Sequence, residues 1–93
     1  MSIRTLLRSK NVPQAAKDAF KLAIISDSPE QALWREAAIR HTLDAFGEIG
    51  GDETGAVDAA RKWFRDCYDD VQLLFEFAGV DPGPVLKSLE ENP

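Results

Sequence analysis

The chain has 93 residues, of which 44% are hydrophobic, and a formal net charge of −5 at pH 7. This length suffices for one compact domain with one core and is too short for two, so we expect a single domain over residues 1–93. One cysteine and one histidine exclude an intramolecular disulfide framework and a zinc site with the usual four nitrogen and sulfur ligands.

The charge is distributed unevenly along the chain. Residues 1–21 carry a net charge of +4, and residues 22–93 carry −9. This pattern predicts a short basic segment attached to an acidic body, so any contact with a polyanion should start at the N-terminus. No apolar run is long enough for a signal peptide or for the roughly 18 residues of a membrane span. We therefore expect a cytoplasmic protein with no membrane partner.

The spacing of apolar residues predicts an all-α domain, because no segment alternates apolar and polar residues over more than a few positions. A short first helix is expected near residues 3–9, although residues 1–12 could also form a mobile basic arm. Pro13 restarts the chain, and the second helix buries a stripe with i, i+4, i+7, i+8 spacing. That stripe consists of Ala16, Phe20, Ala23 and Ile24.

The start of the third helix has the clearest local signal. Ser28-Pro29-Glu30-Gln31 places a hydroxyl cap, a proline at the first helical position and a glutamine three residues after the cap, which is a capping box. The helix should end near Gly47, followed by the flexible loop EIGGDETG. Its expected apolar stripe contains Leu33, Ala37, Leu43 and Phe46.

The C-terminal half is expected to hold the remaining helices of a bundle of about five. A helix that opens near Asp52 or Thr54 should bury Val57, Ala60, Trp63, Phe64 and Cys67. The run DCYDDV interrupts this pattern: Asp66, Asp69 or Asp70 could cap a new helix, or one helix could continue through it. Gly79 should end the next helix, and Asp81-Pro82 should start the last one, before a frayed tail at residues 90–93.

The residues that could carry chemistry are too few and too scattered for an enzyme. A lone helical histidine such as His41 is usually a packing or boundary residue. Cys67 lies among Asp66, Asp69 and Asp70, whose charges oppose a thiolate, so we interpret it as a small buried hydrophobe. The acidic run lacks the spacing of a calcium loop, and GEIGGDETG lacks the lysine of a phosphate-binding loop. We expect no catalytic, cofactor or metal site.

The segment FAGVDPGPVLKSL resembles the helix-turn-helix of bacterial repressors and of many phage proteins, in which a pattern like AxxAGVSxxTVxxxL occurs. Gly79, Val80, Val85 and Leu89 match that pattern. The resemblance implies a helix-turn-helix-like C-terminal hairpin, with Val85 holding the second helix against the first. The charge of this region opposes DNA binding, because residues 66–93 contain seven acidic residues and a single basic residue, Lys87.

A wider resemblance covers roughly residues 32–89. The series ALWREAAIRHTLDAFG, AARKWF, DCYDDV and FAGVDPGPVLKSL is similar to small, mostly uncharacterised proteins of tailed phages, prophages and gene-transfer elements. Those proteins carry an alW…A…DA helix, an A+.W step and an AGLDP..VR..L ending. The resemblance implies a phage-like origin more than an activity.

Three functions follow as hypotheses. The leading one is a non-enzymatic phage-type interaction module whose acidic helical body binds another protein; its candidate contact residues are Trp34, Trp63, Asp69 and Asp70. The alternative is a DNA-binding regulator or small packaging subunit, helped by homo-oligomerisation. Its candidate phosphate contacts are Arg4, Arg8, Lys10, Lys17, Lys21 and Lys87. The third is an inhibitor that mimics nucleic acid with its carboxylates.

Overall fold

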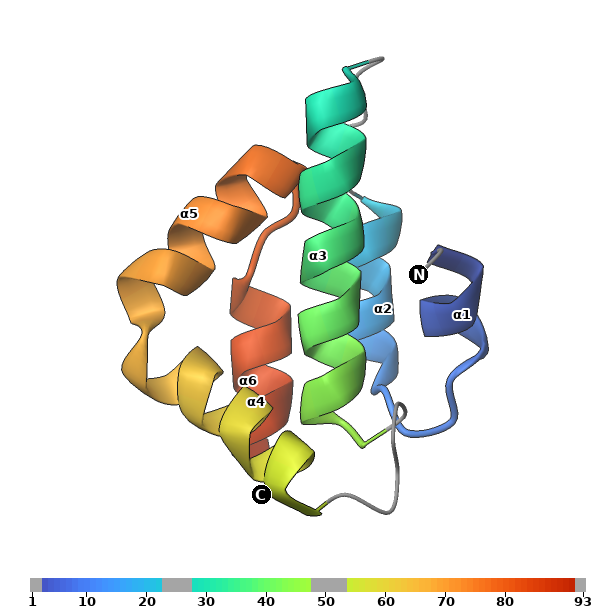
Figure 1. Cartoon of the computed structure of the whole chain (residues 1–93). Coiled ribbons are helices and arrows are strands. Elements are labelled where there is room, and N and C mark those ends of the chain that lie inside the picture. The colour runs from blue at the N-terminus through green and yellow to red at the C-terminus, as the bar shows by residue number, and fades with distance from the viewer. Residues whose placement is uncertain (1–2, 23–27, 48–53, 92–93) are drawn as a thin grey trace.

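The computed structural model describes residues 3–22, 28–47 and 54–91, and the regular secondary structure in these ranges is entirely helical (Figure 1). The all-α class is therefore confirmed. The described residues form six helices rather than about five. They are α1 (Ile3–Arg8), α2 (Gln14–Lys21), α3 (Pro29–Ala45), α4 (Thr54–Asp66), α5 (Tyr68–Ala78) and α6 (Gly83–Glu91). None of these helices is long and apolar enough to cross a membrane.

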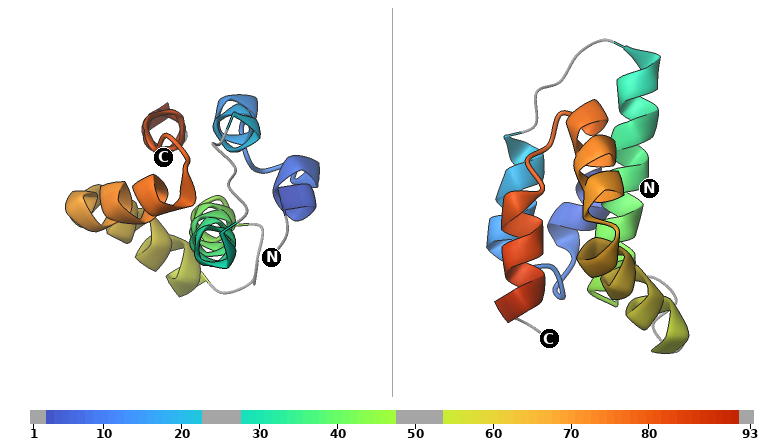
Figure 2. Two further views of the ribbon diagram at one scale, coloured as in Figure 1. Left: turned by 90° about the horizontal axis from the view of Figure 1, so that it is seen from above. Right: turned by 90° about the vertical axis from the view of Figure 1, so that its left-hand side faces the viewer.

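Helix α3 is the centre of the bundle. It packs most extensively against α5 and α4, and it also contacts α1 (Figures 1 and 2). The last helix, α6, packs mainly along α2, with a smaller contact to α4. The expected packing of α6 against α5 is therefore replaced by packing against α2, a neighbour that is distant in the sequence.

Three phenylalanine rings join the two halves of the chain in one core. Phe75 of α5 lies with its ring centroid 5.9 Å from that of Phe20 on α2 and 5.9 Å from that of Phe64 on α4. All three side chains are buried. Leu6 and Val12 are buried in the same core, so the described part of the N-terminal segment is packed on the bundle rather than free as an arm.

The helix boundaries follow local backbone chemistry. Ser28 Oγ accepts a hydrogen bond from Gln31 N at 3.4 Å, which caps the start of α3 as predicted. Gly79 ends α5 with φ of 75°, a left-handed conformation that glycine adopts without steric cost. Asp81 Oδ1 accepts a hydrogen bond from Gly83 N at 2.9 Å and so holds the turn into α6.

The break between α4 and α5 falls at Cys67, where the backbone has φ of −109° and ψ of 47°. A new helix does start here, but none of the three expected aspartates caps it; Cys67 is the N-cap residue and its side chain makes no capping hydrogen bond. Cys67 is half-buried rather than buried, because it lies at this corner instead of inside a helix.

The predicted stripe of α3 needs one correction. Leu33 was expected to be buried, yet it is 66% exposed. The first turns of α3 project beyond the other helices, so only the C-terminal half of α3 lies inside the bundle (Figure 1). Ala23 and Ile24, expected in the stripe of α2, lie outside the described residues, as do Asp52 and most of the predicted loop.

Candidate functional site

Trp34 of α3 and Phe77 of α5 meet at an exposed surface between the two helices, and Leu73 is exposed one turn from Phe77 on the same face of α5. We call the surface made of Trp34, Leu73 and Phe77 the α3–α5 patch. The rings of Trp34 and Phe77 stack with centroids 5.5 Å apart and planes inclined by 29°, while the two side chains remain 41% and 50% exposed. They also line a shallow hollow of about 460 Å³ with Ser28, Glu30 and Gln31. Stacking thus holds the two aromatic side chains in place, although no other part of the described chain covers their exposed sides.

Acidic side chains flank the α5 part of this patch. Leu73 and Phe77 are one turn apart, so they follow each other along the same face of the helix. At 100° per residue, Asp69 and Glu76 fall on one side of this pair and Asp70 falls on the other, and all five side chains are exposed. The outer face of α5 is therefore an acidic amphipathic surface, and we call these five residues the α5 face.

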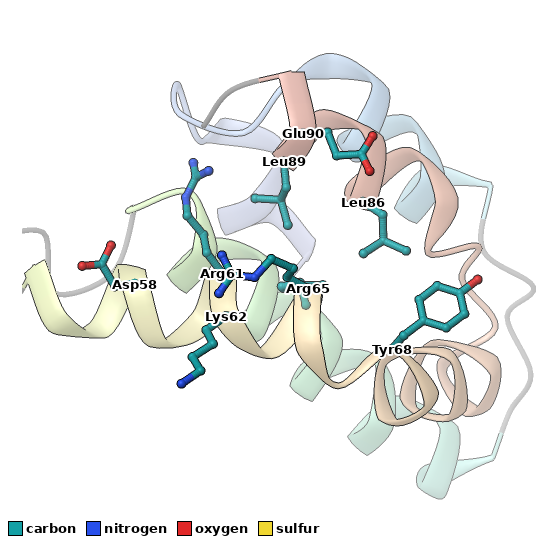
Figure 3. A pocket seen from close by; sticks show the side chains of 9 residues that line it. Asp58, Arg61, Lys62, Arg65, Tyr68, Leu86, Leu89 and Glu90 are labelled. Atoms are coloured by element: carbon teal, nitrogen blue, oxygen red, sulfur yellow. The ribbon is translucent and has the colours of Figure 1, made fainter.

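A groove of about 700 Å³ lies between α4, the start of α5 and α6 (Figure 3). Leu86 and Leu89 point from α6 toward α4 and, with Tyr68 and the buried Phe64, supply its apolar walls. Its polar edge is mixed in sign but contains three bases of α4. These polar residues are Asp58, Arg61, Lys62, Arg65 and Glu90. We call this feature the α4–α6 groove.

The three bases of the groove have different partners. Arg61 Nε donates to the carbonyl oxygen of Ala45 at 2.9 Å, and its guanidinium carbon lies 5.8 Å from the centre of the Phe46 ring, so Arg61 is held at the end of α3. Arg65 Nε donates to Asp66 Oδ1 at 3.0 Å in a pair that is largely exposed. This hydrogen bond lowers the pKa of Asp66 below its usual value. Lys62 is exposed and leaves α4 on the side away from α6.

Comparison with known protein families, curated proteins and solved structures finds no match. The resemblance of residues 32–89 to small phage proteins consequently stays a prediction.

The four residues predicted to bind protein lie in different environments. Trp34 is in the α3–α5 patch. Asp69 and Asp70 are exposed in the first turn of α5, where carboxylates also stabilise the helix dipole. Trp63 is half-buried and its ring stacks on His41, with centroids 4.3 Å apart and planes inclined by 18°. The fold thus brings Trp34, Asp69 and Asp70 to the outer surface of α3 and α5, while Trp63 packs between α3 and α4.

His41 has the environment of a packing residue. Its burial lowers the pKa of the imidazole, an effect that neighbouring Asp44 opposes and Arg40 reinforces. Stacking on Trp63 accounts for its position at the boundary of the core. Within the described residues, no group of three or more His, Cys, Asp or Glu side chains could hold a metal ion.

The six bases of the DNA-binding alternative are spread over three helices and a connecting segment. Arg4 and Arg8 are exposed one turn apart on α1, and Lys10 is exposed in the following segment. Lys17 and Lys21 are on α2, where Lys21 Nζ lies 3.8 Å from Asp18 Oδ1. The sixth base, Lys87, is exposed on α6.

Two features were not predicted from the sequence. The bases Arg61, Lys62 and Arg65 of the groove went unnoticed, although the segment RKWFR concentrates three bases within five residues of an otherwise acidic region. Leu73 and Phe77 were not singled out as surface residues. The signal in the sequence is the four-residue spacing of Asp69, Leu73 and Phe77, which places the two apolar side chains on the same face of α5 as a carboxylate.

Proposed function

We propose that the protein is a non-enzymatic interaction module that binds another protein surface through the α3–α5 patch. The resemblance of residues 32–89 to small proteins of tailed phages and prophages makes a phage or prophage assembly the setting of this proposal.

The observation that carries the proposal is the stacked and exposed pair of Trp34 and Phe77. Large aromatic side chains that stay exposed are costly to leave in water, at roughly 25 cal/mol per Å² of apolar surface. They are also enriched among the few residues that supply most of the binding energy of protein interfaces. Because each ring holds the other in place, little side-chain entropy would be lost when a partner covers them.

The test compares capture of partners by variants with matched chemistry. The wild-type protein is immobilised and exposed to a lysate of the source cells, and captured proteins, including further copies of this chain, are identified by mass. The double variant Trp34→Ser with Phe77→Ser should lose the partner. Leu22→Ser is the control, because Leu22 is 82% exposed and lies outside the patch. Equal capture by the double variant, or no capture by the wild type, would refute the proposal.

The DNA-binding alternative is favoured by one observation, the exposure of Arg4, Arg8 and Lys10 near the N-terminus. Such bases would hold phosphates, and binding would weaken steeply with salt. Retardation of duplex DNA that is lost on replacing these three residues with glutamine would support this function. Absence of retardation at low salt would exclude it. The nucleic-acid mimic remains a third proposal, supported only by the acidic charge of residues 22–93.

A further inference from the structure

The shallow hollow beside the α3–α5 patch combines two aromatic rings with one carboxylate. Besides Trp34 and Phe77, it is lined by Ser28, Glu30 and Gln31, so Glu30 is the one charged group among the described residues that line it. Glu30 is exposed and lies one turn before Trp34 on α3, which places the carboxylate and the indole on the same side of that helix. The hollow therefore offers aromatic surface next to a negative charge.

An exposed aromatic ring beside a carboxylate favours a cationic ligand. The face of an aromatic ring is negative because of its quadrupole, and it attracts cations, most strongly in tryptophan. Trp34 and Phe77 stack on each other, yet both side chains stay exposed, so part of each ring is open to a ligand. The rings and the carboxylate of Glu30 would thus act on a bound cation in the same direction.

The described bases of the two helices do not fill this role. Helix α5 contains no base. Around α3, Arg35 and Arg40 fall about 100° and 120° from Trp34, whereas Glu30 falls within about 40° of it. The positive end of the α3 dipole is offset by Glu30 in its first turn and by the negative end of the α5 dipole near Phe77. A cation for this site has to come from another molecule.

We propose that the hollow binds an arginine side chain from a basic segment of a partner protein. The inference rests on the proposed function, because it names the chemistry by which the α3–α5 patch recognises its partner. The guanidinium would lie on the exposed aromatic surface and donate hydrogen bonds to Glu30. Further bases of the same segment would face the exposed carboxylates of α5, which gives the contact charge complementarity along the patch. Those carboxylates are Asp69, Asp70 and Glu76.

Arginine fits the hollow better than the other candidates. Its guanidinium is planar, stacks on aromatic rings and can donate two parallel hydrogen bonds to one carboxylate. The ammonium of lysine is a compact and strongly hydrated charge, so it loses more hydration when it leaves water. An acidic segment would be repelled by Glu30 and by the carboxylates of α5. A wholly apolar surface would cover Glu30 without pairing it, which costs free energy.

The experiment titrates the ¹⁵N-labelled wild-type protein with a capped peptide of alternating arginine and glycine. The chain has two tryptophans and therefore two indole N–H signals. The signal of Trp34 should move as the peptide binds, whereas that of Trp63, which stacks on His41 between α3 and α4, should stay in place. A peptide of equal length and charge with lysine in place of arginine should bind about threefold more weakly or worse. A glutamate and glycine peptide should not bind.

Two variants separate the contributions of the carboxylate and the ring. Glu30→Gln keeps the shape of the side chain and removes its charge, so the dissociation constant of the arginine peptide should rise about threefold or more. Trp34→Leu keeps an apolar side chain but removes the ring, and binding followed at the backbone amide of Gln31 should weaken by a similar factor. Glu91→Gln is the matched control, because it removes one negative charge at an exposed position of α6 outside the patch, and it should bind like the wild type.

Three results would overturn the proposal. The first is an indole signal of Trp34 that does not move with the arginine peptide. The second is equal binding of the lysine peptide, which would indicate general attraction to an acidic chain. The third is a Glu30→Gln variant that binds as tightly as Glu91→Gln. Circular dichroism checks that each variant is folded, which we expect because all three replaced side chains are exposed.

Failure of this inference is distinguishable from failure of the proposed function. If the arginine peptide does not bind, but capture from the lysate still depends on Trp34 and Phe77, then the patch binds its partner by other contacts and only the arginine site is wrong. If the wild type also captures no partner, both proposals fail.

Discussion

Arg61 connects α4 to the end of α3, and its replacement by methionine tests how the two helices are joined. Arg61 Nε donates to the carbonyl oxygen of Ala45, the last residue of α3, at 2.9 Å. The guanidinium also lies over the ring of Phe46 at 5.8 Å from its centre. The last carbonyl groups of a helix have no partner within the helix, so this arginine satisfies one of them from another part of the chain.

The cost of Arg61→Met can be worked out from these two contacts. A hydrogen bond from a charged donor contributes about 1.5 kcal/mol or more to stability. A partly exposed cation–π contact adds about 0.5–1 kcal/mol. Methionine keeps the packing of the aliphatic stem, and the partly buried carbonyl of Ala45 can recover part of its loss by binding water. The expected decrease in the free energy of unfolding is therefore about 2 kcal/mol.

Urea denaturation followed by circular dichroism measures this decrease, and the melting temperature should fall by about 10 °C. Arg61→Lys keeps the charge but loses the directed Nε–H donor, so we expect it to cost about half as much. Lys62→Met is the matched control, because Lys62 is exposed on the next position of the same helix and should change stability by less than about 0.5 kcal/mol. If Arg61→Met is as stable as Lys62→Met, the inferred capping of α3 is wrong.

Substitutions at three further positions test local determinants of stability. Ser28→Ala removes the N-cap of α3 and should lower the free energy of unfolding by about 0.5–1 kcal/mol in urea titrations, whereas Ser28→Asp should retain most of the stability. Gly79→Ala forces a residue with a side chain into the left-handed conformation with φ of 75°, so the free energy of unfolding should fall by about 1–2 kcal/mol in the same titration. An unchanged midpoint of urea denaturation would contradict the assigned turn. His41 has a pKa below its usual value in the folded state because of burial, so the unfolded chain binds more protons and stability should fall as pH drops below about 6.5. His41→Gln should flatten that dependence between about pH 7.5 and pH 5.5, and an equally steep profile in the variant would show that other groups cause it.

The features that the sequence predicted correctly depend on residues close to one another in the chain. The cap of α3 at Ser28 and the end of α5 at Gly79 were both predicted, because a hydroxyl or a glycine acts on backbone groups within a few residues. The all-α class followed in the same way from the spacing of apolar residues.

The features that were missed depend on which helices become neighbours. Leu33 has the right spacing for a buried stripe, but it lies in the projecting first turns of α3 and is 66% exposed. Similarly, α6 packs on α2 rather than on the adjacent α5. The groove that Leu86 and Leu89 of α6 form with Tyr68 and Phe64 likewise depends on residues that are distant in the sequence. Periodicity identifies an apolar face, but it does not identify what lies against that face.

The position of α6 also changes the interpretation of the helix-turn-helix-like hairpin. Val85 and Ser88 are buried, and Leu86 and Leu89 line the groove, so two sides of α6 are engaged within the molecule. The exposed residues of α6 are Gly83, Lys87, Glu90 and Glu91. A duplex approaching this surface would meet two carboxylates for one lysine, and phosphate contacts depend on an excess of cations. The hairpin is therefore better suited to build one wall of a groove than to read DNA, and any DNA binding would have to start from the bases of α1.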